Sequence, residues 1–403
     1  MSETVLVLGA GVYQLPLIDR YRSKGFSVAV ASIPGQYPGI GRADEFFPID
    51  TRDCEALEEL ARELGVCAVA TAGTDVAMRS LGRLCTALGL PGPSEETAIL
   101  STNKYLMKEA FKKGGVRTSE FIKLDKVEST NFKRLLTCPF MVKCVDSSGS
   151  RGIAKIDAMS DLSRAVEDSL AVSRLDYCIA EGFVEGAEIG IDGYVDQMGD
   201  VVFLTAHDKV VYDNGLTNVP IGHRISSDFL NGIAQTDAYD QAQLAVDSLC
   251  LKDAFFNMDM ILSDGKGWVI EMGARVGGTC IPEVIGSYFG FDYYDKILEA
   301  SLGARPSFQG NALKNATEGR LVYARERSVI ANAFDRVDAF MSVSSDYPVG
   351  TVVDGFLNGS DRIGQIVGHG KDAEELSQCI DAELAHIQNA CLVSAASRET
   401  QGD

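Results

Sequence analysis

The N-terminal part of the chain alternates short apolar runs with amphipathic stretches, and this alternation most constrains the fold. The apolar runs are TVLVLG (residues 4–9), FSVAVAS (26–32) and VCAVATAG (66–73). The intervening stretches, such as 53–65 and 75–89, have the spacing of helices. Apolar strands that alternate with helices indicate a parallel sheet covered on both faces. We therefore predict an α/β, Rossmann-like domain over residues 1–95, which ends at a Pro- and Gly-containing border.

Beyond this border the pattern changes, and a length of 403 residues allows two to three domains. Helical stretches are followed there by strands with clearer alternation, as in antiparallel sheets with one solvated face. We predict a central α+β domain over residues 96–309, with a flap subdomain over residues 136–195. A small C-terminal α+β domain would span residues 310–403 and end in a polar, disordered tail.

Composition removes several classes of protein from consideration. A formal net charge of −20 argues against nucleic-acid binding, because phosphate backbones are bound by an excess of Lys and Arg. No run of about 18 apolar residues is present, and the start of the chain lacks the basic region of a signal peptide, so we expect no membrane association. Ten cysteines without a CxxC pair indicate reduced thiols in a cytoplasmic protein rather than disulfides or zinc.

The turn Gly9-Ala10-Gly11 after the first strand invites a dinucleotide-binding interpretation. The third glycine is missing, and so is the acid expected about 20 residues further on, because the second strand ends in AVASIPG. An NAD-dependent oxidoreductase therefore stays only an alternative, and the turn is interpreted as a tight strand-to-helix connection.

The segment FFNMDMILSDGKGWVIEMGARVGG, residues 255–278, predicts two apolar strands around a tight turn. Gly265 is the midpoint between Asp259 and Glu271, so a hairpin centred there places the two acids opposite each other on one face. Two facing carboxylates repel. A hard cation such as Mg²⁺ would relieve this repulsion, because it prefers oxygen ligands.

Three basic residues are candidates for binding phosphate. Arg275 follows the acids on the same strand, and an acid pair beside an arginine suggests phosphate chemistry. Lys143 lies in an apolar strand directly before the loop DSSGSRG, whose backbone N–H groups could cradle phosphates. Lys104 opens a helix after the domain border. Taken singly, Lys143 is equally compatible with an ordinary hairpin, and Lys104 with a solvated surface position.

In EGFVEGAEIGIDGYV, residues 181–195, Glu181 and Glu188 bracket a turn between two strands. Their spacing assigns no role by itself, since edge strands often carry Glu for solubility. A functional role would be hydrogen bonding to an amino group and to sugar hydroxyls.

Taken in order, these motifs resemble the ATP-grasp superfamily of carboxylate–amine and carboxylate–thiol ligases. The order is a lysine at a helix start, a lysine with a Gly/Ser loop, Glu-x₆-Glu, and then Asp, Glu and Arg in a closing hairpin. The resemblance covers the whole chain: a pre-ATP-grasp domain, the ATP-grasp fold, and a C-terminal domain similar to those of biotin-carboxylase-like and carbamoyl-phosphate-synthetase-like members. It implies ATP and two Mg²⁺ ions as cofactors, for which Mn²⁺ can substitute.

The resemblance also implies roles for individual residues. Asp259 and Glu271 would bind the metal ions, and Arg275 would stabilise the charge of an acylphosphate. The implied ATP-binding residues are Lys104, Lys143, Ser147, Ser148, Gly149, Ser150, Gly152, Glu181, Phe183, Val184 and Glu188. Among these, Glu181 with the backbone of Phe183 and Val184 would hold the adenine, and Glu188 the ribose.

One position departs from the family pattern. Many relatives carry Glu-x-Asn-Pro-Arg, with the Asn as a third metal ligand, whereas this chain has Gly273 at that position. The hairpin register places Asn257 opposite Gly273, and Asn257 is our candidate for the replacement.

The substrate site is expected between the end of the hairpin and the segment 207–227, which we interpret as irregular. Its candidate residues are His223, Arg224, Gly277 and Gly278. An arginine there could pair bidentately with a substrate carboxylate, and a histidine could carry a proton from the amine. The alternative is that His223 and Arg224 are ordinary surface loop residues.

The preferred function is an ATP-dependent carboxylate–amine ligase that forms an amide or peptide bond through an acylphosphate and releases ADP and phosphate. Its substrates would be an amino acid or another small biosynthetic carboxylate, together with an amine. A carboxylase of the biotin-carboxylase or purine-biosynthesis type is the main alternative, and a nucleotide-binding protein without turnover is another. The resemblance also allows a homodimer.

Overall fold

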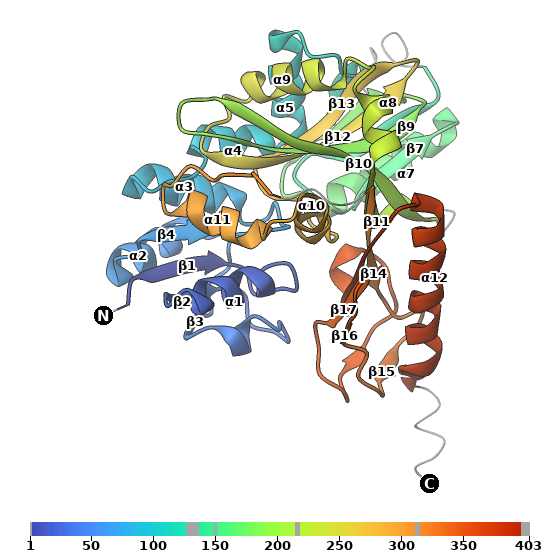
Figure 1. The fold of residues 1–403 in the computed structure, drawn as a ribbon. Coiled ribbons are helices and arrows are strands. Elements are labelled where there is room, and N and C mark those ends of the chain that lie inside the picture. Colours follow the sequence, from blue (N-terminus) through green and yellow to red (C-terminus); the bar gives the residue numbers. More distant parts are fainter. Residues whose placement is uncertain are drawn as a thin grey trace.

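The computed structural model describes residues 2–125, 137–147, 149, 151–213, 218–310 and 315–395. Ser148, Ser150 and the predicted tail at 396–403 lie outside these residues. A parallel sheet near the N-terminus and a large antiparallel sheet form a mixed α/β and α+β fold, as predicted (Figure 1). No helix in the described ranges is long and apolar enough to cross a membrane.

The N-terminal sheet is parallel, with the strand order β3-β2-β1-β4. Its elements are β1 (Thr4–Leu8), α1 (Leu15–Ser23), β2 (Ser27–Ala31), a 3-10 turn (Ile40–Arg42), β3 (Glu45–Phe47), α2 (Cys54–Leu64), β4 (Ala68–Ala70) and α3 (Met78–Leu88). Helix α2 begins at the Asp53 cap and ends at Gly65, whose φ of 58° a glycine adopts without strain. Because β2 and β4 lie on opposite sides of β1, the carboxyl ends of β1 and β4 border a crevice of the kind that binds ligands in such sheets.

A small antiparallel sheet in the order β5-β8-β6-β7 follows. It consists of β5 (Phe121–Leu124), β6 (Phe140–Cys144), β7 (Ile153–Ile156) and β8 (Cys178–Gly182), with α7 (Leu162–Val172) after a 3-10 turn (Met159–Asp161). Helix α7 buries Leu162, Ala165 and Val166 against Phe140 and Val142 of β6 in a core of its own. This sheet carries Lys143 and Glu181, two of the predicted site residues.

The large sheet has nine strands in the order β13-β12-β9-β10-β11-β14-β19-β17-β16. These strands are β9 (Ala187–Val195), β10 (Val201–Asp213), β11 (Asn218–Ser226), β12 (Ala254–Ser263), β13 (Lys266–Gly273), β14 (Ala316–Val322), β16 (Arg336–Val337), β17 (Met341–Ser345) and β19 (Gly364–Gly370). Strand β11 pairs with β14, so the sheet continues across the predicted boundary at residue 309. The division into three domains stays a prediction. A separate sheet joins β15 (Ser328–Ile330), β18 (Val352–Val353) and β20 (Leu392–Ser394).

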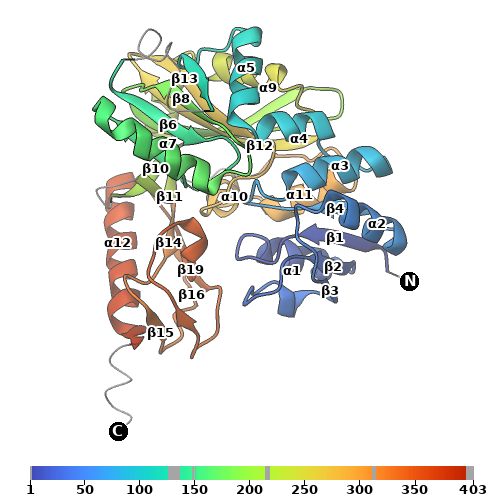
Figure 2. The same ribbon diagram turned by 180° about the vertical axis from the view of Figure 1, so that it is seen from behind.

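Helices cover both faces of the large sheet, as the two views show (Figures 1 and 2). The remaining helices are α4 (Glu95–Ser101), α5 (Lys104–Gly114), α8 (Ser227–Ile233), α9 (Ala238–Ser248), α10 (Ile281–Phe289), α11 (Tyr293–Ser301) and α12 (Ala373–Ala390), with a 3-10 turn at Gly359–Asp361. In β12, Phe256 and Met258 lie in the core that includes α9, whereas Phe255 lies in the core that includes α10. By strand alternation, Asn257 and Asp259 face the α10 side. That side is where the site is built.

The segment 207–227 is not irregular, which corrects the prediction: β10 and β11 form an antiparallel pair through most of it. Pro220 and Gly222 are compatible with a strand at their positions in β11. Pro220 follows a shift in register, where a strand tolerates the missing donor. A Cβ at Gly222 would lie 2.2 Å from the carbonyl oxygen of Gly319, so this glycine permits close approach of the neighbouring strand.

Candidate active site

The hairpin of β12 and β13 places Asp259 directly opposite Glu271, and Asn257 opposite Gly273, as predicted. The turn itself is centred differently from the prediction. Asp264 (φ 50°) and Gly265 (φ 73°) form a two-residue turn that pairs Ser263 with Lys266. This register alone would set Asp259 opposite Ile270, but the register shifts between Asp259 and Met260. Ile270 is the extra residue, a β-bulge that brings Glu271 onto the face of Asp259.

Two lysines flank the acid pair. The Nζ of Lys104 lies 3.0 Å from Glu271 Oε2, and the Nζ of Lys209 lies 2.7 Å from Asp259 Oδ1. Burial by itself would raise the pKa of Glu271, but Lys104 and then Lys143 outweigh it and lower that pKa to about 2. For Asp259 burial prevails, and Glu188 and Glu271 add to it, so its pKa is raised despite Lys209. The site therefore holds a surplus of negative charge that a cation would relieve.

Lys209 was not a predicted site residue, although it contacts two of the predicted ones, Asp259 and Glu188. Its Nζ also lies 2.7 Å from Glu188 Oε1, and only 5% of its side chain is exposed. Burial would lower the pKa of Lys209, but Asp259 and Glu188 raise it above its ordinary value. The sequence carried a signal for this residue: His207 and Lys209 are two apart in the strand segment VVFLTAHDKVV, so both face one side of the strand.

Glu181 lies in a second cluster, on the small sheet. Its carboxylate pairs with Lys143 through Oε1 and lies 2.7 Å from the Nζ of Lys108 through Oε2. Burial would raise the pKa of Glu181, but Lys108 and Lys143 together lower it to about 2. The pKa of Lys108 is lowered by its burial, in spite of Glu181. Lys108 was not predicted, but it stands four residues after Lys104 and hence on the same face of α5.

Arg275 forms a bidentate pair with Asp75, from the loop after β4. Its Nε lies 2.7 Å from Oδ1 and its NH2 nitrogen 2.8 Å from Oδ2. Burial would lower the pKa of Arg275, but Asp75 raises it, with smaller contributions from Asp259 and Glu271. The pair lies against Gly273: a Cβ there would lie 3.2 Å from Asp75 Oδ1 and 3.4 Å from Arg275 Cζ, so a side chain would require the pair to shift slightly. Asp75 was not a predicted site residue.

A row of buried polar side chains crosses four neighbouring strands. His223 on β11 contacts His207 on β10 (Nδ1 to Nδ1, 3.0 Å), and His207 Nε2 lies 2.7 Å from Asp192 Oδ2 on β9. Asn257 on β12 donates to the same Asp192 oxygen at 3.1 Å. Because a carboxylate only accepts, this contact fixes the NH₂ of Asn257 and turns its amide oxygen away from Asp192.

The two residues predicted together at 223 and 224 lie on opposite faces of β11, as strand alternation requires. Burial, and then His207, lowers the pKa of His223 well below its ordinary range, so this histidine is neutral. Arg224 points to the other face, where it contacts Asp208 at 2.7 Å and Ser377 on α12 at 3.1 Å. The structure therefore brings His223 to the side of the acid pair and does not bring Arg224 there.

The loop after β6 lies beside the acid pair of the hairpin, to which Lys104 connects it. Lys104 Nζ donates to the carbonyl oxygen of Ser147 at 2.9 Å, which connects the loop to the acid pair. Gly149 (φ 69°) has open space around it. Gly152 (φ 67°) has a packing role, because a Cβ there would lie 2.4 Å from Val172 on α7. At the far end of the small sheet, Phe183 is 39% exposed, and Lys155 lies 4.4 Å from its ring centre.

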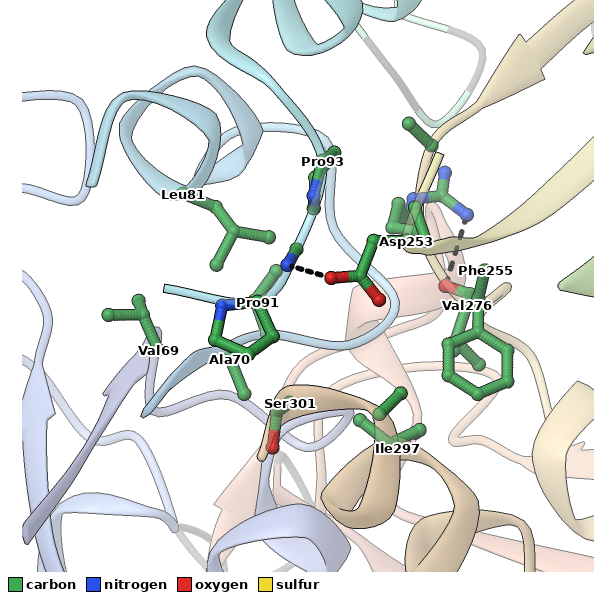
Figure 3. A pocket seen from close by; sticks show the side chains of 16 residues that line it. Val69, Ala70, Leu81, Pro91, Pro93, Asp253, Phe255, Val276, Ile297 and Ser301 are labelled. Atoms are coloured by element: carbon green, nitrogen blue, oxygen red, sulfur yellow. Dashed lines mark hydrogen bonds between the residues drawn. The ribbon is translucent and has the colours of Figure 1, made fainter. Parts of the chain in front are cut away.

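The cavity in Figure 3 lies next to this cluster, because Arg275 is also one of its lining residues. It measures about 60 Å³ and lies where β4, the Pro91–Pro93 segment and α11 meet. Val69, Leu81 and Ile297 line it, and its one carboxylate, Asp253, accepts a hydrogen bond from the Gly92 N–H at 3.0 Å. A drug-sized ligand needs about 300 Å³ or more. A nucleotide therefore does not fit there.

The donor set of the hairpin suits Mg²⁺ rather than a transition metal. Among the described residues, no three His, Cys, Asp or Glu side chains converge in the way a metal cage would require. Two carboxylates, from Asp259 and Glu271, face each other beside lysines. Mg²⁺ is commonly held by one or two carboxylates together with the phosphates of a nucleotide. The residues present therefore fit this ion.

Comparison with known proteins identifies a domain and several relatives. Residues 136–283 match the family model of the ATP-grasp domain. The chain is similar to phosphoribosylamine–glycine ligase of Chlorobaculum tepidum, with 26% identity over 54% of each chain. It is also similar to the enzyme of the same name from Caldanaerobacter subterraneus, with 23% identity over 68% of this chain and 69% of the relative. The alignment thus spans about half the length of the first relative.

Solved structures extend the similarity to the whole chain. Phosphoribosylglycinamide synthetase from Anaerococcus prevotii superposes with a TM-score of 0.77 and 27% identity, over 98% of this chain and 99% of that chain. L-amino acid ligase from Bacillus licheniformis has a TM-score of 0.75 over 97% of this chain and 98% of that chain. At 18% identity the second similarity concerns the fold alone.

Proposed function

We propose, on the premise that this chain carries an ATP-grasp domain as its sequence predicted, that it is an ATP-dependent ligase. The reaction would join a small carboxylate to an amine through an acylphosphate. The observation that carries this proposal is the Asp259–Glu271 pair between Lys104 and Lys209, with Arg275 close by. The relatives, which are named as ligases that act on glycine or amino acids, support the same direction.

The lysines and the loop after β6 would bind ATP. Lys104, which pairs with Glu271, and Lys143, which pairs with Glu181, would contact the phosphates. Lys209 is an addition to the predicted set. Gly149 and the carbonyl-anchored Ser147 would belong to the closing flap. Glu188, which is 40% exposed, would hold the ribose, and Glu181 with the backbone at Phe183 the adenine. Because Lys108 and Lys143 each contact one oxygen of Glu181, an adenine contact would use the second lone pair of an oxygen or replace one of these lysines.

Mg²⁺ would be held by Asp259 and Glu271, with Asn257 in place of the missing side chain at Gly273. The acidic neighbours Glu188 and Glu271, which together with burial raise the pKa of Asp259, support this assignment. The amide oxygen of Asn257, which faces away from Asp192, supports it as well. When bound, the metal neutralises phosphate charge. Two ions are proposed, as in the prediction from the family.

The chemical step needs position and charge more than a protein nucleophile. An oxygen of the substrate carboxylate attacks the γ-phosphorus, and the bond from this phosphorus to the bridging oxygen of ADP breaks. The amine then attacks the acyl carbon, phosphate leaves with its oxygen, and the amine gives up a proton to solvent. Arg275 would hold the acyl oxygens through both steps, because a fixed cation stabilises the charge that develops there.

The test is release of ADP and phosphate from Mg-ATP across a matrix of amino acids and other carboxylates, with and without added amines. The proposal expects release that requires both a carboxylate and an amine, and a product with a new amide bond by mass spectrometry. ADP formed only with bicarbonate would instead establish a carboxylase. NADH binding without ATP binding would overturn the assignment entirely.

A further inference from the structure

The crevice at the carboxyl ends of β1 and β4 is closed by the chain that leaves the hairpin. Gln14 ties the two loops of the crevice together: its amide oxygen accepts from Gly11 N–H at 2.9 Å and its NH₂ donates to the carbonyl of Ala72. The N–H of Gly73 then donates to the carbonyl of Val276 at 3.2 Å. Asp75 in the loop after β4 is thereby held against Arg275, which follows β13, although 200 positions separate them.

The geometry of the Asp75–Arg275 pair leaves polar atoms of both side chains available. Asp75 uses the Nε and NH2 side of the guanidinium, whereas the NH1 nitrogen donates only to the carbonyl of Val276, at 3.3 Å, among the contacts of the described residues. Of the five N–H bonds of the guanidinium, these contacts use three, which leaves one on NH1 and one on NH2. Each Asp75 oxygen accepts one hydrogen bond from Arg275 and has a second lone pair.

Another bidentate arginine–aspartate pair of this protein, Arg362–Asp346, is more deeply buried. Arg362 and Asp346 also form a bidentate pair, at 2.8 and 2.9 Å, and Arg362 reaches the N-terminal loop through the Val12 carbonyl. Their side chains are 2% and 6% exposed. The side chains of Arg275 and Asp75 are 15% and 24% exposed, so the Arg275–Asp75 pair is accessible to a ligand.

The pair also lies beside the proposed phosphate site. Asp75 Oδ1 occupies the space next to Gly273, whose strand partner is Asn257 and whose neighbour two residues earlier is Glu271. The charge of Asp75 also contributes to the raised pKa of Lys104, after the larger contribution of Glu271. A carboxylate bound to the free N–H bonds of Arg275 would therefore lie within the cluster that handles phosphate.

We propose that the Asp75–Arg275 pair is the recognition site for the zwitterion of an α-amino acid. The free N–H bonds of Arg275 would bind the carboxylate that becomes activated, and the free lone pairs of Asp75 would accept from the α-ammonium group. A charge-neutral ion pair complements a zwitterion, which also carries one charge of each sign, so binding leaves no charge unpaired. The proposal rests on the proposed function and adds the class of substrate: a carboxylate with a free α-amine.

The first experiment uses the unmodified protein. For the amino acid that gives the most ADP release, KM is compared with that of its des-amino acid and of its N-acetyl derivative. Loss of the ammonium contact should raise KM by about 30-fold, the effect of one charge-assisted hydrogen bond. Equal KM values for the three compounds would overturn the zwitterion site while leaving the ligase intact.

The second experiment places the effect on Asp75. Asp75→Asn keeps an oxygen for Arg275 but removes the charge. It should raise KM for the amino acid by about 30-fold and KM for the des-amino acid by less than about threefold. Asp253→Asn is the matched control, since Asp253 is another carboxylate that joins the central sheet to an N-terminal segment, through Gly92, and it should change neither value.

The two proposals fail in different ways. If no carboxylate supports ADP release and ATP does not bind, the proposed function is wrong. If carboxylates without an amine are as good as amino acids, or if Asp75→Asn weakens both substrates equally, only the zwitterion site is wrong. Binding of ATP by the Asp75→Asn protein, followed by its thermal unfolding, shows whether this variant is folded.

Discussion

Two clusters in this protein are built from the same parts, lysines and glutamate or aspartate, and differ in their access to solvent. In the cluster of the small sheet, Glu181 lies between Lys108 and Lys143, and the side chains of Glu181 and Lys108 are each only 2% exposed. In the cluster of the hairpin, Glu271 and Asp259 are 38% and 24% exposed beside Lys104 and Lys209.

In the cluster of Glu181 the charges are already paired within the protein, whereas the cluster of Asp259 and Glu271 can still accept a cation. Both oxygens of Glu181 are used by ammonium groups, so an additional cation would have to displace a lysine. Asp259 and Glu271 face each other with exposed oxygens, and the raised pKa of Asp259 reflects its acidic neighbours as well as its burial. The first cluster is thus suited to fixing the small sheet against α5, and the second to accepting a cation together with phosphates.

The strongest test of this contrast is Glu271→Gln. Removing one carboxylate of the open cluster should lower kcat for ADP release on the order of 10³-fold, because charge stabilisation at the phosphates is lost. The melting temperature should stay nearly constant, since Glu271 is partly solvated. Glu299→Gln, which changes an exposed acid on α11, is the control. Full activity of the Glu271 variant would contradict the metal assignment.

Lys108→Met should act in the opposite way, on stability. Removing one partner of a buried ion pair costs about 3 kcal/mol in the free energy of unfolding, because a charge is left with less compensation. Urea denaturation would measure this loss. Lys112→Met is the control, since Lys112 is on the same helix but 65% exposed. A Lys108 variant as stable as the parent would show that the closed cluster is not a structural element.

The pH dependence should distinguish Glu181 from its neutral variant. The folded pKa of Glu181, about 2, is below its ordinary value of 4.5. The stabilisation is therefore present above pH 4.5 and is lost as the pH falls towards 2. The difference in unfolding free energy between the parent and Glu181→Gln should be largest at pH 7 and should shrink below pH 4.5. A difference that does not change with pH would place the effect elsewhere.

The smallest effect is expected for Asn257→Ala. If its amide oxygen replaces the side chain missing at Gly273, the apparent affinity for Mg²⁺ should fall by about tenfold, with a smaller change in kcat. Titration of ADP release with Mg²⁺ measures this. Unchanged Mg²⁺ dependence would remove Asn257 from the set of ligands.

Much of the fold could be predicted because local patterns determine it. The parallel sheet of the first domain follows from apolar strands between amphipathic helices, and the hairpin from its tight turn. The pairing of Asp259 with Glu271 was predicted, but it depends on the bulge at Ile270, which was not. The ATP-grasp resemblance followed from the order of these motifs along the chain, and a match of residues 136–283 to the family model of the ATP-grasp domain confirms it. Helices α8 to α11, without motifs of this kind, were not predicted.

The missed site residues share a physical reason. Lys209 contacts Glu188 and Asp259 only because β9 lies between β10 and β12, an order of strands that the sequence does not state. Asp75 meets Arg275 across 200 residues and two different sheets. Arg224 was predicted to lie with His223, but adjacent residues of a strand face opposite sides, and the strand itself was mistaken for an irregular segment.

The bulge at Ile270 implies an unusual tolerance in the hairpin. A two-residue turn and a regular ladder would pair Asp259 with whatever residue stands at position 270. If Ile270 were deleted, Glu271 would move into that position, so the acids would still face each other. The hairpin thus contains a spare residue at one place, and shortening the chain there would keep the acid pair while straightening the strand.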